Sequence, residues 1–173
     1  MTTADDNRMD SAAIKALYDE HVVALRAFLT GVLRSSELAS DALQATFATA
    51  SSVGHTAREQ SRKGWLFRVA FNEAMAIRRR EKQHGRSLKQ LASNPQRDSL
   101  RPEEIAIRQE TIKQIREALD GLPDEQRRVV RMRIYEEKTF AVIAETLDLP
   151  LGTVLTRMRL ALGKLAKTIG PRS

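Results

Sequence analysis

Cysteine is absent from this chain of 173 residues, which excludes disulfides, thiolate metal ligands and a cysteine nucleophile. Its three histidines, His21, His55 and His84, lack the spacing of metal ligands, and we expect each of them at the surface or at its boundary. No nucleophile–base pair and no phosphate-binding loop is recognisable either. The sequence therefore predicts neither an enzyme nor a bound metal or cofactor.

Long apolar runs are also absent, and the first ten residues are polar. The sequence therefore predicts neither a membrane span nor a signal peptide, and we expect a cytoplasmic protein.

Aromatic residues make up only 5% of the chain, whereas hydrophobic residues as a whole make up 42%. Together with abundant Ala, Leu, Arg and Glu, this composition favours helices over sheet, and we expect an all-α fold. The formal net charge of +7 suits a polyanionic partner such as nucleic acid. A basic surface without such a role is the alternative.

The C-terminal stretch 139–169 has the pattern of two short helices joined by a tight turn. Thr139 can cap the first helix with its hydroxyl group, and Pro150 both ends that helix and suits the start of the next one. Each helix has one apolar face with helical spacing. The two faces consist of Phe140, Ile143, Ala144 and Leu147 in the first helix, and of Val154, Met158, Ala161, Leu165 and Ile169 in the second.

The second of these helices carries polar residues that suit DNA. Thr156 and Arg159 lie opposite its apolar face, and Arg157 and Lys164 lie on its flank. Arginine can bond guanine edges bidentately, threonine can contact a base edge or a thymine methyl group, and lysine pairs with phosphate. The pattern is typical of a helix-turn-helix, and its alternative is an ordinary helical hairpin with solvated basic residues.

In the N-terminal half, helices are predicted over 10–33 and from Ser35-Ser36 to about Ala50, followed by a polar loop over 51–63. The next helix, over 64–80, has two distinct faces. One is apolar, and the opposite stripe combines cations with an amide, with Trp65 at its border. These faces consist of Leu66, Ala70, Ala74 and Ile77, and of Arg68, Asn72, Met75 and Arg79, respectively.

Such a stripe suits separated DNA strands, because cations hold the backbone, a ring stacks on a base and an amide bonds a base edge. The alternative for Trp65 is a place in the core.

Residues 81–101 are polar and lack periodicity, so they predict a linker between two helical domains, 10–80 and 102–170. In the second domain, a helix is expected to start at Pro102 and to end near Gly121. A further helix begins at Pro123 and should pack against the helix-turn-helix. The apolar residues of these two helices are Ile105, Ile112, Ile115 and Leu119, and then Val129, Val130 and Ile134.

Several of these segments resemble extracytoplasmic-function sigma factors, the small promoter-specificity subunits of bacterial RNA polymerase. Residues 122–130 (LPDEQRRVV), Ile143-Ala144, residues 150–154 (PLGTV) and Arg157 resemble their region 4. In region 2, residues 41–47 (DALQATF) resemble the segment that docks on the clamp of the polymerase largest subunit, and residues 65–72 (WLFRVAFN) match the segment that melts and reads the minus-ten element.

The resemblance implies a non-enzymatic transcription initiation factor whose partners are RNA polymerase core and promoter DNA, and we expect a monomer when it is free. Similar proteins are commonly held by an anti-sigma protein, but nothing in this sequence identifies one. The expected site residues are Trp65, Arg68, Asn72 and Arg79 for the minus-ten element, Thr153, Thr156, Arg157, Arg159 and Lys164 for the minus-thirty-five element, and Asp41, Gln44 and Phe47 for the polymerase.

The sequence also departs from the family pattern. Ala45 stands where members normally carry an acidic residue, so we expect weaker docking on the clamp. The loop at 51–63 lacks the aromatic residue that members usually place there. Leu155 and Leu160 should project outward where members often carry basic residues, and Leu162 lies toward the core side.

Two other functions remain open at this stage. A conventional helix-turn-helix regulator that binds DNA as a dimer accounts for 139–169 but leaves 41–47 and 65–80 unexplained. A sigma-like protein that sequesters a partner, without binding promoters, accounts for the outward Leu155 and Leu160.

Overall fold

The computed structural model describes residues 9–58, 61–85 and 101–169. Its helices are α1 (Ser11–Leu33), α2 (Ser36–Val53), α3 (Arg62–Gln83), α5 (Pro102–Asp120), α6 (Asp124–Ile134), α7 (Phe140–Leu147) and α8 (Leu151–Thr168), with a short 3₁₀ helix η1 (Gly54–Thr56) after α2. The described part of the chain contains no strand, which confirms the all-α fold.

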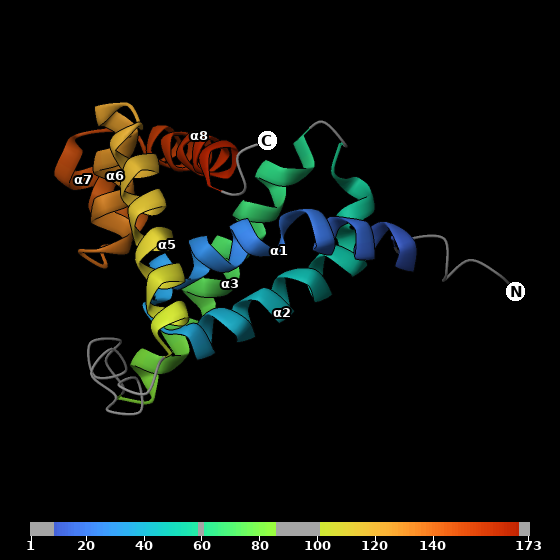
Figure 1. The fold of residues 1–173 in the computed structure, drawn as a ribbon. Coiled ribbons are helices and arrows are strands. Elements are labelled where there is room, and N and C mark those ends of the chain that lie inside the picture. The colour runs from blue at the N-terminus through green and yellow to red at the C-terminus, as the bar shows by residue number, and fades with distance from the viewer. Residues whose placement is uncertain (1–8, 59–60, 86–100, 170–173) are drawn as a thin grey trace, which may run out of the picture.

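Helices α1, α2 and α3 pack against one another in the N-terminal half (Figure 1). The ring of Phe28 on α1 lies 5.0 Å from the ring of Phe67 on α3, and both side chains are buried. Between α1 and α2, Arg34 takes a left-handed backbone conformation (φ 53°), and the hydroxyl of Ser35 accepts a hydrogen bond of 3.2 Å from the N–H of Leu38. The predicted start of α2 is therefore confirmed, with Ser35 as its cap.

The C-terminal half consists of α5 followed by the predicted helix-turn-helix and its supporting helix. The hydroxyl of Thr139 accepts a hydrogen bond of 3.2 Å from the N–H of Val142 at the start of α7. Asp148, with φ 52°, ends α7 in the left-handed conformation that reverses the chain toward α8. Val129 and Val130 of α6 are fully buried, and α6 packs on both α7 and α8. These features agree with the sequence prediction.

The two halves also pack against each other. Figure 1 shows α5 beside α1, and α8 contacts α3. Gly31 permits the first contact, because a Cβ atom at this position would lie 2.7 Å from Cδ1 of Ile115 on α5. The boundaries 10–80 and 102–170 stay a prediction, and most of the predicted linker 81–101 lies outside the described residues.

Four expectations require correction. Residues 51–63 are not all loop, because α2 continues to Val53 and is followed by η1. Met75 was expected on the polar stripe, but it is buried. Helix α3 contacts α1, α2 and α8, so more than one of its sides is covered. Ile105 and Ile112 show the reverse error: they are exposed, although their spacing fits an apolar face.

The fourth correction concerns His21, which is 6% exposed and belongs to the interior of the N-terminal half rather than to the surface or its boundary. Burial lowers the pKa of its imidazole from the usual value of about 6.5, the nearby Lys63 lowers it further, and only Glu20 raises it. The native fold therefore favours the uncharged ring.

This burial predicts a pH dependence of stability. Because the pKa of His21 is lower in the folded than in the unfolded chain, stability is fully present above about pH 6.5 and is lost as the pH falls toward the folded-state pKa. Urea unfolding at about pH 7.5 and 5.5 should show this loss in the wild type and a smaller one in His21→Gln. His55→Gln, at an exposed position, is the matched control and should keep the wild-type difference. Equal losses in wild type and His21→Gln would contradict the assignment.

Candidate nucleic-acid interface

Helix α8 presents most of its predicted DNA-reading residues to solvent. Thr156, Arg159 and Lys164 are exposed, whereas Thr153 and Arg157 are half-buried. The helix is held from behind by Val154 and Met158, which are buried with the apolar face of α7. The exposed residues therefore lie on the face that a recognition helix would turn toward a groove.

Arg157 of α8 forms an ion pair with a residue of α6. Its Nη2 atom lies 3.2 Å from Oε2 of Glu125 at the start of α6, and its side chain is 23% exposed. A contact with phosphate requires Arg157 to leave this ion pair or to share it. Arg159 and Lys164 are the more accessible cations for DNA.

The leucines of α8 divide as the helical projection predicts. Leu155 and Leu160 are each 44% exposed, while Leu162 is buried. Ala166 is buried one turn after Leu162, so the C-terminal part of α8 is covered over more of its circumference than its N-terminal part. This extra coverage coincides with the contact between α8 and α3.

Helix α3 carries three of the predicted minus-ten residues at exposed positions: Arg68, Asn72 and Arg79. Trp65 is half-buried and packs against the core, with its ring 3.7 Å from the place of a Cβ on Gly54. Trp65 therefore packs partly in the core and stays partly exposed, and its contact with DNA remains a prediction. Since α3 contacts α8, the two predicted DNA-reading sets lie on neighbouring helices.

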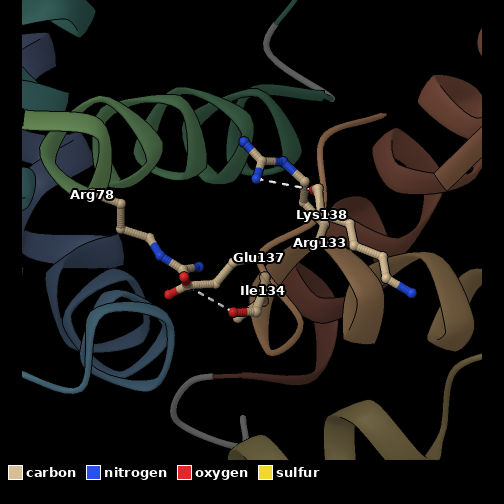
Figure 2. A network of polar contacts seen from close by, with 5 residues as sticks. All are labelled: Arg78, Arg133, Ile134, Glu137 and Lys138. Carbon is tan, nitrogen blue, oxygen red and sulfur yellow. Dashed lines mark hydrogen bonds and ion pairs between the residues drawn. The ribbon is translucent and has the colours of Figure 1, made fainter. Parts of the chain in front are cut away.

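Arg78 makes a contact that the sequence analysis did not anticipate. Figure 2 shows its side chain leaving α3 and pointing toward Ile134, at the end of α6, and Glu137, just beyond that end. Its Nη2 atom donates hydrogen bonds of 2.8 Å to the carbonyl oxygen of Ile134 and to Oε1 of Glu137. The sequence pointed to this contact only through the run of three arginines at 78–80. Helical geometry places the three side chains on different faces of α3, so the run does not show which of them makes the contact.

Arg133 lies near the same junction. Its Nη1 atom donates a hydrogen bond of 3.3 Å to the carbonyl oxygen of Lys138, and its guanidinium lies 5.1 Å from the centre of the Phe140 ring (Figure 2 shows the first contact). Burial lowers the pKa of Arg133, and the neighbouring charges of Arg78 and Arg79 lower it further. The junction between the halves therefore concentrates positive charge.

The predicted polymerase-binding residues of α2 fall into two groups. Asp41 and Gln44 are exposed, three residues apart on one face. Phe47 is buried, and its ring lies 5.0 Å from the ring of Tyr18 on α1. Phe47 therefore supports the helix from inside, whereas Asp41 and Gln44 are available to a partner.

Within residues 9–58, 61–85 and 101–169, no group of three histidine, aspartate or glutamate side chains is placed to hold a metal ion. Over the same residues, no helix has the length and apolar character needed to cross a membrane.

Comparison with known proteins adds an independent observation. The family "Sigma-70, region 4" matches residues 118–167, which run from the end of α5 to the end of α8. The match therefore covers the helix-turn-helix and the helix that supports it.

Whole-chain relatives extend the likeness to the N-terminal half. The ECF RNA polymerase sigma factor SigL of Mycobacterium tuberculosis is 29% identical over 167 residues, covering 92% of this chain and 90% of that protein. SigK of Mycolicibacterium vanbaalenii is 25% identical over 170 residues, with 93% and 84% covered. RpoE of Cereibacter sphaeroides is 26% identical over 170 residues, with 95% and 90% covered.

Proposed function

We propose that this chain, which belongs to the extracytoplasmic-function branch of the sigma-70 family, is a transcription initiation factor that binds RNA polymerase core and directs it to specific promoters. The observation that carries the proposal is the exposed polar face of α8, set on a capped α7 within the part of the chain that matches region 4. In this proposal the protein acts in the cytoplasm, is a monomer when free and has two helical domains.

The minus-thirty-five element is read by α8. Thr156 and Arg159 contact base edges, since both side chains are exposed on the outward face. Lys164 neutralises a phosphate, and Arg157 and Thr153 add backbone contacts near the start of the helix. The ion pair with Glu125 holds the Arg157 side chain in place until DNA phosphate competes with Glu125 for Arg157.

The minus-ten region is opened and read by α3. Arg68 and Arg79 hold the DNA backbone, and the amide of Asn72 bonds a base edge. The accessible part of Trp65 stacks on an unpaired base, which contributes about 1–3 kcal/mol. All four residues lie on a single helix, so their spacing is fixed before DNA binds.

A second function, sequestration of a partner without promoter binding, is favoured by one observation. Leu155 and Leu160 are large apolar residues that remain exposed on α8, where a protein partner could cover them. An anti-sigma protein is a candidate partner under either function. The two functions differ in whether the chain supports transcription.

Run-off transcription tests this distinction directly. Core polymerase should produce specific transcripts from a pool of genomic promoter fragments only when this chain is added. Transcripts that are the same with and without the chain would refute the initiation function and leave sequestration as the better account.

The polymerase contact gives a second prediction. The double variant Asp41→Ala with Gln44→Ala should bind core polymerase at least about tenfold more weakly, because a hydrogen bond to a charged group contributes about 1.5–3 kcal/mol. Fluorescence anisotropy of the labelled chain measures this affinity. Ser40→Ala, at an exposed neighbouring position of α2, is the matched control and should bind normally. Unchanged affinity of the double variant would remove this face of α2 from the interface.

A further inference from the structure

The segment that leads into α1 reaches the ring of Trp65. The side chains of Met9 and Trp65 both come within 4 Å of one point, the place where a Cβ atom on Gly54 would stand. The Cγ atom of Met9 lies 3.3 Å from this point, and the Cη2 atom of Trp65 lies 3.7 Å from it. We infer that Met9 is a positioning residue, which holds the Trp65 ring for stacking on an unpaired base of the minus-ten region. This inference rests on the proposed function.

The backbone of Met9 is anchored at the end of α2. Its N–H donates a hydrogen bond of 3.1 Å to the carbonyl oxygen of Ser51. Ser51 lies in the last turn of α2, where carbonyl groups lack partners within the α-helix, so this hydrogen bond satisfies one of them. Figure 1 shows the same arrangement, with the start of α1 beside the end of α2. Met9 therefore has a defined place in the fold, although it precedes the first turn of α1.

Gly54 provides the space for the Met9 side chain. Its backbone dihedral angles, φ −64° and ψ −21°, are those of a right-handed helical turn, which most residues adopt. The backbone conformation therefore does not require glycine. A Cβ atom at this buried position would instead collide with the Sδ atom of Met9. Glycine at position 54 thus serves the close approach of Met9.

The contact is made at the edge of the Trp65 ring. Cη2 belongs to the outer edge of the six-membered ring of the indole, so Gly54 meets Trp65 there, with Met9 beside both. A thioether next to an aromatic ring is a favourable neighbour, commonly at the ring edge. Such packing restricts rotation of the side chain, and Trp65 remains partly exposed, as stacking on a base requires.

A ring that is already held loses less freedom when it stacks. Trp65 lies in the first turn of α3, so its backbone is fixed and the remaining freedom is that of the ring. Ordering one such side chain on binding lowers affinity by roughly 2- to 10-fold. Met9 imposes this order before DNA arrives. Met9→Ala should therefore reduce the yield of opened promoter by about the same factor.

The fluorescence of Trp65 tests the positioning directly, because the chain contains one tryptophan. Met9→Ala should increase the quenching of its emission by acrylamide. Met9→Leu, which keeps nearly the same apolar volume, should restore the wild-type value. Leu38→Ala is the matched control, since Leu38 is also partly buried and lies about 24 Å from Gly54 along α2. It should lower stability in urea without changing the quenching.

Permanganate reactivity of unpaired thymines measures opening, with core polymerase and the promoter that gives the strongest run-off from the genomic pool. Met9→Ala should show the expected loss, and Met9→Leu should not. Gly54→Ala should lose as much as Met9→Ala, because its backbone accommodates alanine while the flexible end of Met9 has to leave. The double variant should lose no more than either single variant, because both changes remove the same contact.

The inference is wrong if Met9→Ala leaves the quenching of Trp65 unchanged. It is also wrong if the quenching increases while the promoter opens as well as with the wild type. Losses that multiply in the double variant would contradict it too, since Met9 and Gly54 would then act independently. If the wild type itself supports neither run-off nor opening, the proposed function has failed, whatever the quenching shows.

Discussion

Arg159→Ala is expected to change which DNA sequence the protein selects, and to weaken binding to its preferred site roughly 5- to 150-fold. The loss corresponds to about 1–3 kcal/mol for one bidentate contact between arginine and guanine. Arg159 is exposed on the outward face of α8 and, unlike Arg157, is not paired with Glu125. Binding-site selection from a randomised pool, with polymerase present, measures both the affinity and the motif.

Lys164→Ala is the matched comparison, because Lys164 is an exposed cation on the same helix. It should weaken all sequences alike and lower the salt dependence of binding by about one ion, as expected for a phosphate contact. If the selected motif were the same for Arg159→Ala as for the wild type, Arg159 would be a backbone contact. Leu155 and Leu160 would then be better candidates for readout, through thymine methyl groups.

Leu66→Ala is expected to lower the free energy of unfolding by about 2–5 kcal/mol, since truncation of a fully buried leucine loses apolar burial and leaves a cavity. Leu66 is completely buried on α3. Leu155→Ala makes the same chemical change at a position that is 44% exposed, so it should alter stability by only about 0.5 kcal/mol. Urea unfolding of the two variants beside the wild type measures the difference.

This comparison separates folding from recognition. Leu66→Ala should act on stability, whereas Leu155→Ala can affect only surface contacts. Similar losses of stability in both variants would mean that Leu155 is covered in solution, for example by a second copy of the chain. Such a result would favour the dimeric regulator over the monomeric initiation factor.

Helical periodicity predicted most of the fold. The apolar spacing in residues 139–169 located α7 and α8, and the hydroxyl groups of Ser35 and Thr139 marked two helix starts that the structure confirms by hydrogen bonds. These signals are local, because a cap or a repeat of 3.6 residues involves neighbours along the chain. Caps and periodicity therefore locate a helix along the chain, but they do not show which other helices it packs against.

The errors of the sequence analysis arise from contacts between distant segments. Met75 is buried because α3 is enclosed by α1, α2 and α8, whereas Ile105 is exposed although its spacing fits an apolar face. Periodicity shows which face of a helix is apolar, but not how much of its circumference is covered. The Arg78 contact with Glu137 joins residues 59 positions apart, and no local pattern encodes such a pair.

For the candidate site, the sequence likewise predicted which side chains are exposed but not their contacts with distant helices. The helical projection placed Thr156, Arg159 and Asn72 outward, and each is exposed in the structure. It gave no warning that Arg157 would be paired, or that the ring of Phe47 would turn inward against Tyr18. Both outcomes depend on helices that are remote in sequence.

The short length of α7 has a consequence for the order in which the C-terminal half assembles. Its eight residues are too few for a stable isolated helix, because nucleation is unfavourable and helices shorter than about 12–15 residues are marginal in water. Helix α7 therefore persists only while Ile143 and Ala144 remain buried against α6 and α8. Its backbone amides should exchange hydrogen with solvent in step with those of α8, so that a ligand bound to α8 alone also slows exchange throughout α7.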